Sequence, residues 1–404
     1  MISSKLIFAP TLALLVAGCG ASGDATPPRT THDVPNQIIA TRSQGTVKEL
    51  RARGERALLA QRWQEAADAF EAVIAGDPAS ADDPRLLYDL AIAYEGLGAR
   101  EKARDRYREI IRRFPSDGNV KNAMAREMSI DAYLEDWKAL GEVGEAILAR
   151  SDLDPVERML GLGARGLSRI ELGDERGASH DIQEGLDLVD EHHYGATGRS
   201  PVAAAQLKFA HGELRRVRSE KISLVPVTDD YAVKLEMRCA GLLDAQAAYA
   251  DAIRAVDPQW AAMSGFRIGQ MYRAIHTHMM QVQPKAETVK TESDRQLAYG
   301  IMHMRFRAFL EKGLEMMDRT LRFAEKTGDA AWAKRAAEAK AEMEKTLEEE
   351  KATIKASPYT EEQLQRTLDM MTKRMRDKAE AEQKKAEAAQ KKAEAAQKKA
   401  APKP

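Results

Sequence analysis

A spaced pattern of small, aromatic and proline residues recurs in the first half of the chain and constrains its fold more than any other feature. Two sets share successive intervals of 12, 4 and 8 residues: Gly54, Ala66, Phe70 and Pro78, then Ala91, Ala103, Tyr107 and Pro115. In each set we expect two amphipathic helices, in which small residues let the pair cross closely and the aromatic ring fills the seam. The proline then ends the second helix. The sequence therefore predicts stacked helix pairs.

The pattern continues with two weaker units, so that units start near residues 47, 84, 121 and 159. It resembles the tetratricopeptide repeat, a helix–turn–helix unit of about 34 residues. The starts are 37, 37 and 38 residues apart, which predicts connecting turns that are three or four residues longer than usual. Loops tolerate such insertions at low cost. The resemblance implies an all-α fold, a tetratricopeptide-like α-solenoid, with repeats over 46–192.

A second helical block is expected over 200–356, as a divergent helical repeat domain. Ala245, Tyr249, Ala252 and Pro258 are spaced like the second helix of a further unit. Helices are predicted over 293–327 and 330–355, with Gly328-Asp329 as the break between them. The only strand-like alternation lies at 222–227.

The segment 360–404 is a charged tail in which the heptad Lys-Lys-Ala-Glu-Ala-Ala-Gln recurs from Lys384. These residues favour helix, but alanine is the only apolar side chain in the heptads and is too small to drive a stable coiled coil. We expect a long exposed helix or a low-complexity tail. Residues 373–404 carry 11 Lys/Arg against 5 Asp/Glu, a net charge of +6 (11 − 5). The tail resembles the Lys/Ala/Glu-rich spacers of bacterial envelope proteins.

The N-terminus holds an apolar run, Leu6 to Gly18, that ends in Val-Ala-Gly directly before Cys19. The run is long enough for a secretory signal core and too short to span a bilayer as a helix. It resembles the lipobox of bacterial lipoproteins, which implies a signal peptide over 1–18 and acyl chains such as palmitate on Cys19. The alternative is an ordinary signal peptide with a chance cysteine. Residues 19–45 are rich in Ser, Thr, Pro and Gly and predict a disordered, flexible linker.

Residue 20 is Gly, so the Asp that commonly retains lipoproteins at the inner membrane is missing. By that resemblance we expect a lipid anchor in the outer membrane of a Gram-negative bacterium, with the mature chain facing the periplasm of the cell envelope. The membrane would then be contacted through Cys19.

Tetratricopeptide repeats resembling this pattern bind partners in a concave groove lined by fixed positions of the first helices. Carried onto this sequence, those positions are Lys48, Arg51, Glu55, Arg85, Tyr88, Ile92, Glu95, Asn122, Ala125, Ser129 and Tyr133. The subtype that clamps C-terminal carboxylates needs Lys and Asn at positions that here hold Arg51, Glu55 and Asp89, so clamp function is not expected. The mixed lining suits an extended or helical peptide.

A search for catalytic spacings finds no HExxH, GxSxG, Walker A or CxxC pattern. We therefore expect no catalytic residues, no metal site and no cofactor. The 62 Lys/Arg nearly balance the 63 Asp/Glu, and the tail lacks aromatic residues, so no nucleic-acid partner is expected. The leading hypothesis is a non-enzymatic scaffold lipoprotein that binds an envelope protein or peptide. Two alternatives stay open: a spacer whose basic tail reaches peptidoglycan, and an enzyme with its site in 200–356.

Overall fold

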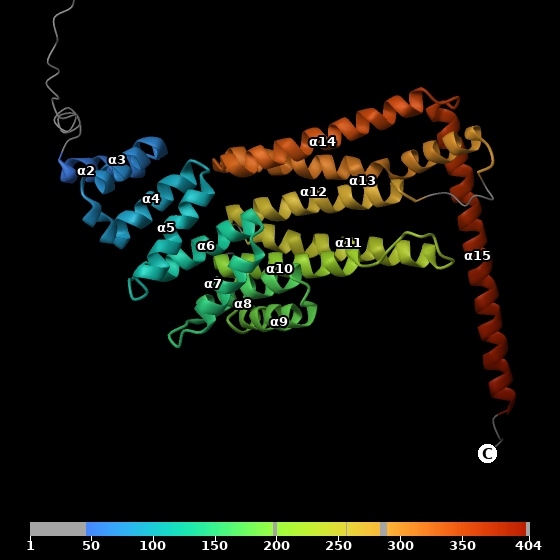
Figure 1. Cartoon of the computed structure of the whole chain (residues 1–404). Coiled ribbons are helices and arrows are strands. Elements are labelled where there is room, and N and C mark those ends of the chain that lie inside the picture. Colours follow the sequence, from blue (N-terminus) through green and yellow to red (C-terminus); the bar gives the residue numbers. More distant parts are fainter. Residues whose placement is uncertain (1–45, 197–199, 256, 283–288, 401–404) are drawn as a thin grey trace, which may run out of the picture. The chain divides into compact units, whose positions relative to one another are not determined.

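The computed structural model describes residues 46–196, 200–255, 257–282 and 289–400 (Figure 1). Within these ranges every regular element is a helix, so the all-α prediction is confirmed. The strand-like stretch at 222–227 forms no strand, because it lies in the connection between two helices. The predicted signal peptide, Cys19 and the linker to residue 45 lie outside the described residues. Among the described helices, none combines the length and apolar character needed to cross a bilayer.

The first block consists of four successive helix pairs joined by short turns. Their bounds are α2 Val47–Leu59 and α3 Trp63–Gly76, α4 Pro84–Gly96 and α5 Arg100–Arg113, α6 Val120–Leu134 and α7 Trp137–Leu148, α8 Pro155–Glu171 and α9 Glu175–Glu191. A short 3-10 helix, Pro78–Asp82, lengthens the first connection. The first helix of a pair thus begins at residue 47, 84, 120 or 155. The fourth start, expected at 159, is four residues earlier because Asp154 and Glu157 form a capping box around Pro155.

The small and aromatic residues of the repeat pattern lie where the sequence predicts. Gly54 faces the ring of Phe70, and a β-carbon added there would stand 2.5 Å from that ring. In the second pair Ala91, Ala103 and Tyr107 are fully buried. Close crossing of the helices therefore depends on missing side-chain volume in one helix and an aromatic ring in the other.

The described residues of the second block form five helices: α10 Val202–Glu220, α11 Tyr231–Arg254, α12 Pro258–Met280, α13 Glu292–Thr327 and α14 Ala330–Lys355. The helices predicted over 293–327 and 330–355 match α13 and α14 to within one residue. Gly328, at φ 76°, ends α13 in the left-handed conformation that glycine adopts at little cost. Each helix packs on the next, and α10 also packs on α8, so the core continues from the first block into the second.

The tail begins with α15, Glu361–Ala400, which packs on α13 at its start. Leu364 is buried against Gly300, and the hydroxyls of Tyr359 and Ser293 lie 2.7 Å apart. Residues 369–374 are exposed. The helical alternative for the tail is therefore the one observed.

Candidate partner-binding site

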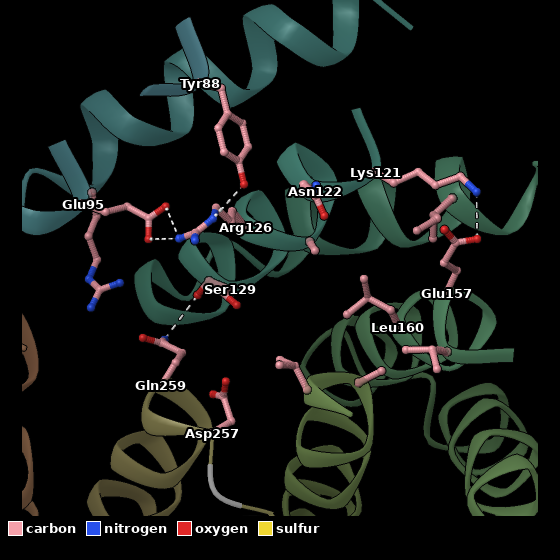
Figure 2. A pocket seen from close by; sticks show the side chains of 16 residues that line it. Tyr88, Glu95, Lys121, Asn122, Arg126, Ser129, Glu157, Leu160, Asp257 and Gln259 are labelled. Carbon is pink, nitrogen blue, oxygen red and sulfur yellow. Dashed lines mark hydrogen bonds and ion pairs between the residues drawn. The ribbon is translucent and has the colours of Figure 1, made fainter. Parts of the chain in front are cut away.

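A pocket of about 520 Å³ opens along the inner side of α6 (Figure 2). We call it the α6 pocket. The repeats supply one side of it, from helices α4 to α8, and the starts of α10 and α12 supply the other. Five residues that the repeat resemblance placed in the groove line it: Tyr88, Glu95, Asn122, Ala125 and Ser129.

Arg126 organises the polar wall of the α6 pocket. Its Nη1 lies 3.1 and 3.2 Å from the two carboxylate oxygens of Glu95, and its Nε donates to the hydroxyl of Tyr88 at 3.1 Å. Burial alone would lower the pKa of Arg126, but Glu95 raises it above the usual value. The hydroxyl of Tyr107 also donates to Glu95, at 2.5 Å. This wall is therefore a preorganised set of charges held from three helices.

The other end of the pocket holds a second ion pair and an unused amide. The Nζ of Lys121 lies 2.8 Å from Glu157 and 3.4 Å from Asp152. Asn122, one position along α6, is exposed, and its side chain makes no hydrogen bond within the described part of the chain. An amide side chain both donates and accepts, so it can pair with a peptide group.

Between these polar ends lies an apolar floor of Val156, Leu160, Val202 and Ala203. Val202 is half exposed, and Leu160 is partly buried. The helices α8 and α10 begin here, at Pro155 and Val202, which brings their first turns to the pocket. An apolar side chain of a partner would bury surface on this floor, while the polar ends hold its backbone.

The remaining groove residues do not line this pocket. Arg51 is paired with Glu55 at 3.4 Å and with Asp83 of the next unit at 2.6 Å, so it joins neighbouring repeats. Lys48 and Arg85 are exposed, and Ile92 is half buried. A role for these side chains in binding stays a prediction.

Tyr133 differs from the expectation because helix α14 covers it. Its ring meets the ring of Trp332 edge-on, with centroids 4.9 Å apart, and its hydroxyl donates to the carbonyl of Ala331 at 3.4 Å. A partner in the groove would therefore not reach Tyr133 in this arrangement. The repeat pattern could not reveal this contact, which joins residues about 200 positions apart.

Sequence reasoning missed the contributions of Arg126, Asp257 and Gln259. Arg126 lies four residues after Asn122, on the same face of α6, so helical spacing could have found it. Gln259 donates to the backbone carbonyl of Ser129 at 3.4 Å from the start of α12 (Figure 2). No local signal predicts that contact.

Part of the repeat region matches a known family. The family model of the tetratricopeptide repeat matches residues 57–127. The matched segment runs from the end of α2 into α6. Comparison with curated proteins gives no match.

Solved tetratricopeptide repeat structures also resemble this chain. A tetratricopeptide repeat protein from Parabacteroides merdae has 12% identity and a TM-score of 0.39, covering 74% of this chain and 98% of that one. The TPR2AB domain of yeast Sti1, solved in complex with pHSP90, has 14% identity and a TM-score of 0.23, with the same coverages.

The ionisable groups of the second block bear on the enzyme alternative. Glu350 lies 3.2 Å from His276 and 2.5 Å from His303, and all three are buried. Burial would raise the pKa of Glu350, but the two adjacent histidines hold it at about 2. This cluster is packed between α12, α13 and α14. No group of ligating residues in the described ranges has the geometry to hold a metal ion.

Proposed function

We propose that this protein is a scaffold of the bacterial cell envelope that binds a partner polypeptide in the α6 pocket. The carrying observation is the pocket itself: an apolar floor between two polar ends, built on tetratricopeptide repeats. An extended segment suits this surface because its side chains and its peptide groups alternate in direction. One apolar side chain of the partner would pack against the floor, and Asn122 would form hydrogen bonds with the partner's adjacent backbone.

The envelope part of the proposal rests on the sequence before residue 46. Replacing Cys19 by Ala should abolish labelling by a palmitate analogue and release the protein from the membrane fraction. Labelling of Cys19→Ala equal to that of the wild type would refute the anchor, but it would leave the pocket untouched.

The pocket is tested by filling it. Asn122→Arg places a long charged side chain at the pocket wall, at an exposed position that tolerates it. Ser116→Arg, in the exposed turn between α5 and α6, is the matched control. Photo-crosslinking from Ala125 in intact cells should yield a defined adduct in the wild type and in Ser116→Arg, and none in Asn122→Arg.

An adduct that persists unchanged in Asn122→Arg would show that the partner does not occupy the pocket. Circular dichroism of both variants checks that the helices are retained. A variant that unfolds is replaced by Asn122→Lys, which has a smaller head group.

The spacer function is a second candidate, supported by α15. A continuous helix over Glu361–Ala400 is about 60 Å long, and its sequence from residue 373 is basic. Deleting 373–404 should abolish sedimentation with purified peptidoglycan if the tail is a spacer. Unchanged sedimentation would exclude that role.

A further inference from the structure

Arg100, the first residue of α5, connects the α6 pocket to a distant part of the chain. It lines the pocket and is only 6% exposed. Its Nη2 lies 3.0 and 2.8 Å from the two carboxylate oxygens of Asp329. In a solenoid each unit contacts mainly its neighbours, so a pair 229 residues apart is an additional contact.

Asp329 belongs to a segment that we call the α13–α14 corner, residues 328–335. It caps α14 by accepting a hydrogen bond from the backbone N–H of Trp332 at 3.1 Å. Trp332 is 1% exposed and lies against Tyr133, and Arg335 donates to the carbonyl of Tyr133 at 2.7 Å. The corner therefore covers the groove position that the repeat pattern offers to a partner.

The contact has the composition of a binding interface between proteins. Trp, Tyr and Arg are the residues that dominate such interfaces. The corner is also linked to the pocket, because Trp332 Nε1 donates to Gln259 at 3.0 Å, and Gln259 donates to Ser129. Arg100, Gln259 and Ser129 all line the pocket. A molecule in the pocket would thus touch the groups that hold the corner.

The charges around Arg100 favour a carboxylate. Its Nε is buried and has no hydrogen-bond partner among the described residues, so one donor is unused. The pocket glutamates, Glu95 and Glu157, are each paired with a neighbouring cation, and Asp257 accepts from the first turn of α12. Three helices, α8, α10 and α12, begin at the pocket, and helix N-termini carry partial positive charge.

We propose that the α13–α14 corner is an intramolecular competitor for the groove, and that the partner carries a carboxylate which replaces Asp329 on Arg100. This inference rests on the proposed function. Arg100 begins the second helix of its unit, so it is not one of the carboxylate-clamp positions, which hold Arg51, Glu55 and Asp89. Partner binding and corner docking are then antagonistic, and each lowers the affinity of the other by the same factor.

The test removes the charge of Asp329 and keeps the helix cap. Asp329→Asn retains capping, because Asn caps helices as well as Asp. Asp174→Asn is the matched control: Asp174 caps α9 in the same way, accepting from Gly177 at 2.9 Å, away from the pocket. In the full chain without any ligand, hydrogen exchange over 329–335 should become faster in Asp329→Asn than in Asp174→Asn. Equal exchange would show that the ion pair does not hold the corner.

The ligand arm uses defined probes. One set contains acetylated eight-residue peptides with one Leu and one Asp in an Ala/Ser background, and the matched set has Asn in place of Asp. Asp329→Asn should bind the Asp set about 5- to 20-fold more tightly than the wild type does, within the usual range for coupled sites. Its affinity for the Asn set should rise less, because those peptides offer no carboxylate to Arg100. Arg100→Gln should remove the preference for Asp.

The outcomes separate the two proposals. If both sets bind equally well to the wild type and to Asp329→Asn, the carboxylate inference is overturned and the pocket function stands. If neither set binds either protein, the pocket function fails, and the inference fails with it. Tighter binding of the Asp set by Asp174→Asn as well would show a general charge effect and would also overturn the inference.

Discussion

The closest helix crossing in the first repeat gives a quantitative test of the repeat packing. In Gly54→Ala the added methyl would stand 2.5, 2.7 and 2.9 Å from three ring carbons of Phe70. Carbon atoms in contact are normally about 3.5–4.0 Å apart, so the ring must move by about 1 Å. Phe70 is fully buried, and protein interiors are close-packed, so such a movement must displace neighbouring side chains.

The expected magnitude follows from two opposing effects. Overpacking costs about 1–3 kcal/mol, and replacing Gly by Ala in a helix returns about 1 kcal/mol. Three ring atoms overlap with the methyl, so we expect the upper part of the overpacking range. The net loss in the free energy of opening α2 and α3 should be about 1–2 kcal/mol.

Native-state hydrogen exchange over 47–76 is the suitable assay, because a terminal repeat can open without unfolding the rest. Gly118→Ala is the control: a β-carbon there meets no atom within 4 Å, and its backbone is outside the left-handed region. It should be neutral or slightly stabilising, by less than about 1 kcal/mol. Equal protection of α2 and α3 in the two variants would refute the view that missing volume at Gly54 sets the crossing.

Two further predictions concern buried charges. Burial and nearby Glu127 raise the pKa of Asp131 to about 7, so folding disfavours its ionisation. The folded state should therefore lose stability as pH rises from ~4 to ~7. The variant Asp131→Asn should reduce that loss. Urea unfolding at pH ~5 and ~8 measures both, and an identical pH dependence in the variant would contradict the assignment. Glu213 is fully buried and pairs with Arg216 at 2.6 Å and Arg267 at 2.9 Å. Arg216 keeps Glu171 and Glu220, and Arg267 keeps Glu135, but Glu213→Gln removes the fully buried carboxylate that the two guanidinium groups share. Thermal unfolding should therefore show a loss of about 2–3 kcal/mol, less than the cost of an unpaired buried charge; a loss below about 1 kcal/mol would be contrary to this reasoning.

The repeat units were predictable because their signals are local. Gly54 and Phe70 are 16 residues apart, and a small residue paired with an aromatic one indicates which faces of the two helices meet. The fourth unit was misplaced by four residues because its weak pattern suggested Met159, whereas the capping box at Asp154 sets the true start. Helix caps act within one turn, so attention to them could have corrected the boundary.

The candidate site was predictable only in part. Tyr88, Glu95 and Asn122 were identified because fixed positions on repeat helices face the same side. The opposite wall, with Val202 and Gln259, comes from helices that follow the repeats by many residues. No periodicity relates those residues to the repeats, and the same is true of Trp332 over Tyr133.

The sequence by itself determined that this chain forms stacked helix pairs, since helix period, small residues and caps all act over a few turns. Only the tertiary structure decided which part of the groove stays open. That outcome depends on where α12 and α14 meet α6, and small rotations summed over successive helix pairs set those meeting points. A long-range pair such as Arg100 and Asp329 is therefore invisible in the sequence.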